Sequence, residues 1–158
     1  ARAAGGAPSW CELTAPAVPA WADVAPVPTA GPGPEFARHF EYRLIAGVPT
    51  SGATGEALGW IRARAPGPAR DAAYLAAMID AWWPCALNRL PAFRPMATIA
   101  FTLELIADAA AIADRDAPLL YRARSPVCAD GYARETRELW SADGALLAIN
   151  HQTFAIIQ

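Results

Sequence analysis

The sequence of 158 residues contains no lysine, and all 13 of its basic residues are arginine. Together with 15 acidic residues they give a formal net charge of -2, so composition offers no argument for nucleic acid or an anionic membrane as partner. Cysteine is also scarce. Cys11, Cys85 and Cys128 are odd in number and have no metal or redox spacing, which favours a reducing, cytoplasmic setting.

Long hydrophobic runs are missing as well, although hydrophobic residues make up 54% of the chain. The main candidate for a membrane span, residues 71–83, is shorter than the roughly 20 apolar residues that a bilayer requires. No signal peptide is visible, and the chain begins with Ala1 rather than Met. We therefore expect one domain without a membrane partner, taken from a processed or longer chain.

Proline is concentrated at the start of the chain. Residues 1–34 hold seven prolines interleaved with alanine and glycine, which is typical of a semi-extended linker. Trp10 and Trp21 could pin this linker to a surface groove. A linker in this position needs a unit before it, so we divide the chain into a linker, 1–34, and a folded domain, 35–158.

The folded domain is organised around one predicted helix, residues 71–83, with the sequence DAAYLAAMIDAWW. Asp71 is a good N-cap, and an apolar stripe follows at helical spacing. The opposite face carries alanine rather than charge, which predicts a helix buried on nearly all sides. The stripe consists of Leu75, Met78, Ile79, Trp82 and Ala86.

Asp80 interrupts this apolar helix. The positions three and four residues away carry no basic side chain, so no local ion pair is available. Pro84 follows within one turn and should kink or end the helix. A buried aspartate is costly unless it is hydrogen-bonded or paired. Asp80 is therefore either a structural residue that caps another strand or a catalytic carboxylate.

Strand patterns lie on both sides of the helix. The first two cover 36–45 and 57–65, and a third at 96–107 places Ile99, Phe101, Leu103 and Leu105 on one face. The last three cover 119–128, 132–141 and 145–157. They are separated by Asp-Gly pairs at 130–131 and 143–144, whose type I′ turns need positive φ at both residues, so they predict an antiparallel meander.

Two strands, one apolar helix and four further strands predict an α+β protein whose antiparallel sheet curls around one long buried helix. That architecture is a hotdog fold. The fold alone does not define a function.

Four segments in order resemble the acyl-CoA thioesterases of the thioesterase II type: MIDAWWP, MATIAFTLEL, LWSADGALLA and NHQTFAII. The resemblance covers about four fifths of the chain. It implies the C-terminal hotdog unit of a double-hotdog protein, an acyl-CoA substrate, no cofactor, and pairing with a second hotdog unit. The alternative is a unit that only binds acyl-CoA or supports a catalytic partner.

The resemblance implies that Asp80, Thr98 and Gln152 hold the hydrolytic water. A carboxylate in a dry site can accept a proton from that water, and hydroxyl and amide groups can orient it without adding charge. A backbone N–H near a helix end would stabilise the oxyanion. In the other reading, Thr98 is only a β-branched strand residue and Gln152 faces solvent. Asn150 and Thr102 are substitutes if the register differs.

Other hotdog enzymes fit less well. The D-x-N-x-x-H pattern of the hydratases and the early D-x-x-x-H-x-N stretch of the hydroxybenzoyl-type thioesterases are both absent. No metal-ligand spacing appears. The phosphates of coenzyme A could meet arginine side chains, although scattered arginine is usually solvated surface. The candidates are Arg62, Arg64, Arg89 and Arg94.

Overall fold

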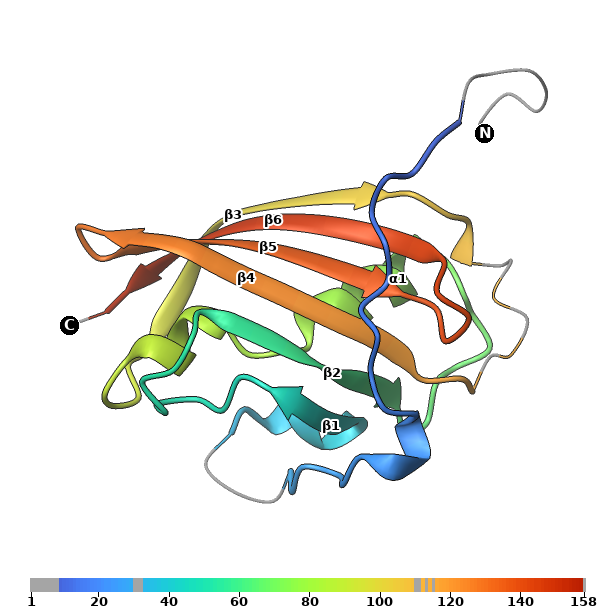
Figure 1. Cartoon of the computed structure of the whole chain (residues 1–158), viewed down its shortest axis with the longest axis horizontal. Coiled ribbons are helices and arrows are strands. Elements are labelled where there is room, and N and C mark those ends of the chain that lie inside the picture. Colours follow the sequence, from blue (N-terminus) through green and yellow to red (C-terminus); the bar gives the residue numbers. More distant parts are fainter. Residues whose placement is uncertain (1–8, 30–32, 110–111, 113, 115, 158) are drawn as a thin grey trace.

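In the computed structural model, a six-stranded antiparallel sheet curls around one α-helix, which confirms the predicted hotdog fold (Figure 1). The described residues are 9–29, 33–109, 112, 114 and 116–157. The helix α1 packs against β2, β5 and β6. The strand order in the sheet is β1-β2-β4-β5-β6-β3. The elements are β1 (Phe40–Ala46), β2 (Glu56–Ala63), α1 (Ala72–Asp80), β3 (Met96–Leu105), β4 (Leu119–Ala129), β5 (Tyr132–Trp140) and β6 (Leu146–Ile156).

Strands β4, β5 and β6 form the predicted meander. Asp130 and Gly131 have φ values of 50° and 80°, as the type I′ turn requires. The second turn is different, because only Gly144 of its Asp-Gly pair has positive φ. The chain there closes a wider loop, in which Ser141 N donates to Ala145 O at 2.8 Å. The expectation of two positive φ values was therefore wrong for Asp143.

The helix begins as predicted and ends earlier. Asp71 Oδ1 accepts a hydrogen bond from Tyr74 N at 3.0 Å, which is the expected N-cap. The helix then ends at Asp80, and Pro84 precedes a short 3₁₀ helix, η3 (Cys85–Arg89). Proline cannot donate a helical hydrogen bond, so α1 has no continuation. Asp80 is thus the last residue of the helix, not a residue in its middle.

The predicted apolar stripe forms the core. Trp82 is 2% exposed, and its ring stacks on Tyr121 with 4.8 Å between ring centroids. Gly59 makes room for it, because a Cβ at that position would lie 2.7 Å from the Trp82 ring. The alanine face is different: Ala73 and Ala77 are exposed. The expectation that the helix is covered on nearly all sides was therefore wrong for the single chain.

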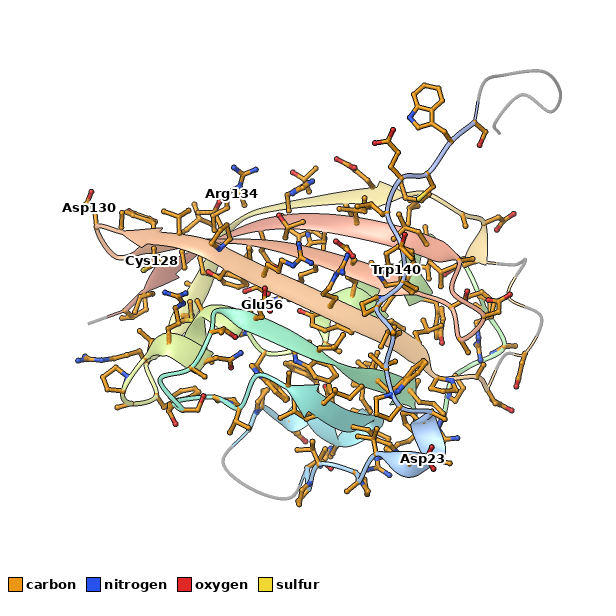
Figure 2. All side chains as sticks on the ribbon, viewed as in Figure 1. Asp23, Glu56, Cys128, Asp130, Arg134 and Trp140 are labelled. Atoms are coloured by element: carbon orange, nitrogen blue, oxygen red, sulfur yellow. The ribbon has the colours of Figure 1, made fainter. Side chains whose placement is uncertain are left out.

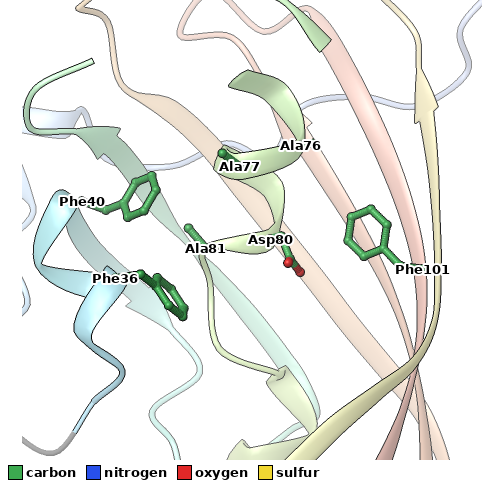
Figure 3. Close-up of a pocket in the computed structure, with 7 residues that line it drawn as sticks. All are labelled: Phe36, Phe40, Ala76, Ala77, Asp80, Ala81 and Phe101. Atoms are coloured by element: carbon green, nitrogen blue, oxygen red, sulfur yellow. The ribbon is translucent and has the colours of Figure 1, made fainter. Parts of the chain in front are cut away.

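The first strand starts later than the alternation predicted. Residues Glu35–His39 form a 3₁₀ helix, η2, and β1 begins at Phe40. Pro34 precedes η2, and its carbonyl accepts a hydrogen bond from Ala37 N at 3.0 Å. This local hydrogen bond turns the chain before the ladder can form. It also places Phe36 beside the end of α1 (Figure 3).

The N-terminal segment crosses the outer face of the sheet (Figure 1). Trp60 Nε1 donates to Pro19 O at 3.0 Å, and the Trp21 ring lies 4.1 Å below the guanidinium of Arg43. Trp21 holds the segment as expected, whereas Trp10 is 80% exposed. The segment covers an apolar cluster that includes Trp140 (Figure 2). Residues 1–8 and 30–32 of the expected linker lie outside the described residues, and its boundary at residue 34 stays a prediction.

Candidate active site

An apolar pocket of about 480 Å³ opens beside the end of α1. Asp80 is the one carboxylate among its lining residues, and its side chain is 52% exposed. The expected burial of Asp80 was therefore wrong in the single chain, because the alanine side of the helix stays open. Figure 3 shows the Asp80 carboxylate directed between α1 and Phe101 of β3. The lining residues are Phe36, Phe40, Ala76, Ala77, Asp80, Ala81 and Phe101.

The structure brings Asp80, Thr98 and Gln152 together. Gln152 Nε2 lies 3.0 Å from Thr98 Oγ1 and 3.4 Å from Asp80 Oδ1. The Gln152 residue is 3% exposed, so it does not face solvent. Its Oε1 atom is buried and has no hydrogen-bond partner among the described residues. Most buried polar atoms are hydrogen-bonded, so a spare acceptor at this position needs an explanation, such as a catalytic role or a bound water.

A β-bulge in β3 places Thr98 on the same face as Phe101. The register with β6 shifts between Thr98 and Ala100, so Thr98 lies opposite Phe154 and Phe101 opposite Gln152. Paired residues share a face of the sheet, and both partners on β6 point towards the helix. Strict alternation had put Thr98 on the opposite face from Phe101. Ile99, which was expected on the buried face, is 60% exposed at the bulge.

Two further charged residues at the site were missed from the sequence. Arg137 Nη1 lies 3.2 Å from Asp80 Oδ1, and Arg137 Nε donates to Glu135 Oε1 at 2.8 Å. The local pattern around Asp80 offers no basic partner, because none lies within one helical turn. The available signal was the alternation of β5, which places Glu135 and Arg137 on one face with the buried Ala133 and Leu139.

Arg137 is a buried cation held among acidic and polar groups. Its side chain is 1% exposed. Burial by itself would lower the pKa of Arg137, but Tyr121, Glu135 and Asp80 raise it above its ordinary value. The guanidinium therefore carries a permanent positive charge beside Asp80.

Cys85 lies in the same network and is not a candidate nucleophile. Burial, followed by the charge of Glu135, raises the pKa of the Cys85 thiol far above its ordinary value. Its Sγ donates to Gly55 O at 3.2 Å, and its backbone N–H donates to Glu135 Oε2 at 2.9 Å. The thiol therefore stays protonated, and covalent chemistry through Cys85 is not supported.

The helix end beside Asp80 does not offer an oxyanion donor. It is the C-terminal end, which presents carbonyl groups, and Ala81 N is already bonded to Ala77 O at 3.0 Å. The N–H of Cys85 is taken by Glu135. The N–H groups of Ala81 and Cys85 are therefore both engaged and do not serve as the expected oxyanion donor.

The substitute residues do not hydrogen-bond to Asp80 in the described part of the chain. Asn150 Nδ2 donates to Thr102 O at 2.9 Å, so the amide is bound to backbone. His151 lies near Thr136 and Glu104 on the other face of the sheet.

The arginines considered for the phosphates of coenzyme A lie apart from this group. Arg62 pairs with Glu41 at 2.9 Å. Arg64 donates to Phe40 O, and Arg89 and Arg94 are exposed.

The described residues contain no group of three or more His, Cys, Asp or Glu side chains that could hold a metal ion. None of the helices in that part of the chain has the length and apolarity that a membrane crossing requires.

The site offers a carboxylate at the mouth of an apolar pocket. Its Oδ1 atom is held by a guanidinium and an amide, and a hydroxyl lies next to that amide. Such a set can orient a water molecule and accept its proton.

Comparison with known proteins gives a consistent result. The family model for the acyl-CoA thioesterase C-terminal domain matches residues 15–156. No curated protein matches the chain. A conserved protein of unknown function with a hot dog fold from Alicyclobacillus acidocaldarius is 31% identical, with a TM-score of 0.85, over 98% of this chain and 58% of that chain.

Two more distant structures share the fold. An acyl-CoA thioesterase II from Mycobacterium marinum is 18% identical, with a TM-score of 0.63, over 97% of this chain and 59% of that one. A TesB protein from Mycobacterium avium subspecies paratuberculosis is 16% identical, with a TM-score of 0.71, over 95% of this chain and 56% of that one. The chain thus spans less than two thirds of the length of these structures.

Proposed function

The chain belongs to the acyl-CoA thioesterase C-terminal domain family, and from this premise we propose that it hydrolyses an acyl-CoA thioester to a free acid and coenzyme A. The observation that carries the proposal is the hydrogen-bonded group of Asp80, Gln152 and Thr98 at the mouth of the apolar pocket. Its chemistry suits a thioester, whose carbonyl needs an activated water and whose acyl chain needs apolar walls.

In the proposed reaction, Asp80 accepts a proton from a water molecule as the water oxygen attacks the thioester carbonyl carbon. Gln152 and Thr98 orient that water through directional hydrogen bonds. The tetrahedral adduct then collapses, and its carbon–sulfur bond breaks. The sulfur leaves with the bond electrons and takes up the proton, so the products are a carboxylic acid and the thiol of coenzyme A.

The acyl group would lie in the pocket between α1, η2 and β3. The walls there are phenylalanine and alanine side chains, which would keep bulk water from the reacting carbonyl once the pocket is covered. In the single chain the pocket is open on the alanine side of α1. We propose that a second hotdog unit, from another copy or from a longer chain, covers this side and completes the site in the cytoplasm.

The second candidate is a unit that binds acyl-CoA without hydrolysing it, or that supports a catalytic partner. One observation favours it. The Asp80 carboxylate is 52% exposed and already ion-paired with Arg137, and a general base works best in a dry site. Binding of acyl-CoA without release of thiol would identify this candidate.

The test is release of free thiol from a panel of acyl-CoAs of short to long chain, with Asp80→Asn beside the wild type. Asparagine keeps the shape and removes the proton acceptor, so we expect kcat to fall by about 10²–10⁴-fold with little change in substrate affinity. Asp23→Asn, on a separate 3₁₀ turn, is the matched control and should keep full turnover. Full turnover in Asp80→Asn would contradict the mechanism even if the wild type is active.

A further inference from the structure

Glu135 and Arg137 form an ion pair that is almost completely removed from solvent. Their side chains are 0% and 1% exposed, and the Nε–Oε1 distance is 2.8 Å. Burying two charges costs free energy that their attraction often does not recover, so such a pair is weak evidence of a stabilising role. Its contacts indicate a different role.

The Glu135–Arg137 pair is hydrogen-bonded to the backbone on both sides of Asp80. Arg137 Nη1 donates to Ile79 O at 3.2 Å, where the last carbonyl groups of α1 lack helical partners. Glu135 Oε2 accepts from Cys85 N at 2.9 Å, at the start of η3. The backbone on either side of Asp80 is therefore fixed to two neighbouring positions on the same face of β5.

Arg137 also fixes the carboxylate itself. Arg137 Nη1 and Gln152 Nε2 both reach Asp80 Oδ1, at 3.2 and 3.4 Å. The terminal torsion of an aspartate is otherwise broad, so an unheld carboxylate would turn freely at this exposed position. With Oδ1 engaged by two donors, Oδ2 is the oxygen left to accept a proton.

We propose that Arg137 is a positioning residue, anchored by Glu135, which holds Oδ1 of Asp80 so that Oδ2 meets the hydrolytic water. This inference rests on the proposed thioesterase function. Arg137 acts through Asp80 and need not touch the substrate. Its loss should therefore lower kcat and leave KM nearly unchanged, because a misplaced base costs turnover and leaves the apolar pocket intact.

The experiment compares Arg137→Met with Arg122→Met in the purified protein. Arg122 is a matched control, because it pairs with Glu138 across β4 and β5 and is also largely buried, away from Asp80. We expect Arg137→Met to lower kcat by about 10–100-fold with KM within about twofold. Arg122→Met should keep kcat. Equal kcat losses in the two variants would overturn the inference.

A double-mutant cycle separates positioning from a general structural effect. In an Asp80→Asn background, Arg137→Met should cause no further loss of the residual kcat, because the group that it positions is gone. A loss of the same size in both backgrounds would overturn the inference.

If Arg137→Met does not fold, Arg137→Lys and Glu135→Gln replace it. Arg137→Lys keeps the positive charge but loses the planar guanidinium. Glu135→Gln keeps the shape of the side chain but weakens its bond to Arg137. Both should lower kcat, and full turnover in both would overturn the inference.

A wild type that releases no thiol would instead refute the proposed function and this inference with it. An inactive Asp80→Asn beside a fully active Arg137→Met would refute only the positioning role.

Discussion

At the scale of single residues, Gln152 connects the candidate site. Its Nε2 group bonds to Thr98 on β3 and to Asp80 at the end of α1. These partners are 54 and 72 residues away in the sequence. Because one amide holds both side chains, changes at Gln152 and Thr98 should act on the same water.

We expect Gln152→Ala and Thr98→Ala each to lower kcat less than Asp80→Asn does. Combined with Asp80→Asn they should add little, since groups that serve one water are not additive. Thiol-release kinetics on the single and double variants measure this. Thr102→Ala, on the same strand and exposed, is the control and should keep turnover. Fully additive losses would show that the three residues serve different steps.

Glu41 gives a prediction on stability and pH. Burial by itself would raise its pKa, but hydrogen bonds from Arg62 and Arg43 outweigh this and hold the pKa below the ordinary 4.5. A lowered folded-state pKa means that the contribution of this group is fully present above pH 4.5 and is lost as the pH falls through the folded-state value. Glu41→Gln should remove that part of the acid dependence.

Urea unfolding of the wild type and Glu41→Gln, at neutral pH and at several values below 4.5, tests this prediction. The difference in the free energy of unfolding between the wild type and Glu41→Gln should become smaller as the pH falls. Glu35→Gln is the control, because its ion pair with Arg38 is largely exposed. A difference in the free energy of unfolding that stays constant with pH would contradict the lowered pKa of Glu41.

At the scale of elements, one extra residue in β3 decides which side chains reach the site. Strict alternation would place Thr98 on the opposite face from Phe101, but the bulge puts both residues on the face that points towards α1. β3 is also the edge strand next to β6, and Ile99 and Phe101 on it are 60% and 38% exposed. The apolar face expected from its sequence is therefore only partly covered within the chain.

The meander turns give a prediction for elements. Gly131 and Gly144 have φ values of 80° and 87°, a region that a β-branched residue adopts only with strain. Gly131→Val and Gly144→Val should each lower the free energy of unfolding by about 1–3 kcal/mol, as measured by urea or thermal unfolding. Gly67→Val is the control, because a Cβ there meets no atom within 4 Å. Unchanged stability in both turn variants would contradict the strain argument.

At the scale of the whole molecule, the exposed alanine face of α1 and Phe101 of β3 border the pocket and predict association. The two tryptophans after α1 do not contribute to this surface. Trp82 is 2% exposed, and both rings pack inside the chain against Tyr42. The apolar surface that remains open on this side includes Ala77 and Phe101, both of which line the pocket.

We expect the 158-residue chain to form dimers or larger assemblies at micromolar concentration, and Ala77→Arg, on the exposed face of α1 beside the pocket, to weaken them. Light scattering measures the mass. Val127→Arg is the control, because Val127 is 51% exposed near the β4–β5 turn, away from the pocket. A monodisperse wild-type monomer would contradict the prediction, and equal effects of the two substitutions would place the interface elsewhere.

The sequence by itself determined the elements that depend on local chemistry. Asp71 caps a helix because its side chain reaches a backbone N–H three residues on, and Asp130-Gly131 turns the chain because both residues tolerate positive φ. The succession of strands along the chain and the β4-β5-β6 meander followed from these turns and the apolar patterns, whereas the place of β3 beside β6 did not. Asp80 was recognisable because a charge on an apolar helix needs a reason to be there.

Only the tertiary structure decided what surrounds Asp80. Its partner Arg137 is 57 residues away, and the bulge that brings Thr98 to Gln152 exists only in the register between β3 and β6. The open alanine face likewise depends on which elements pack against α1. Contacts across such distances are set by packing between elements, and a linear pattern records only neighbours within a turn or a strand.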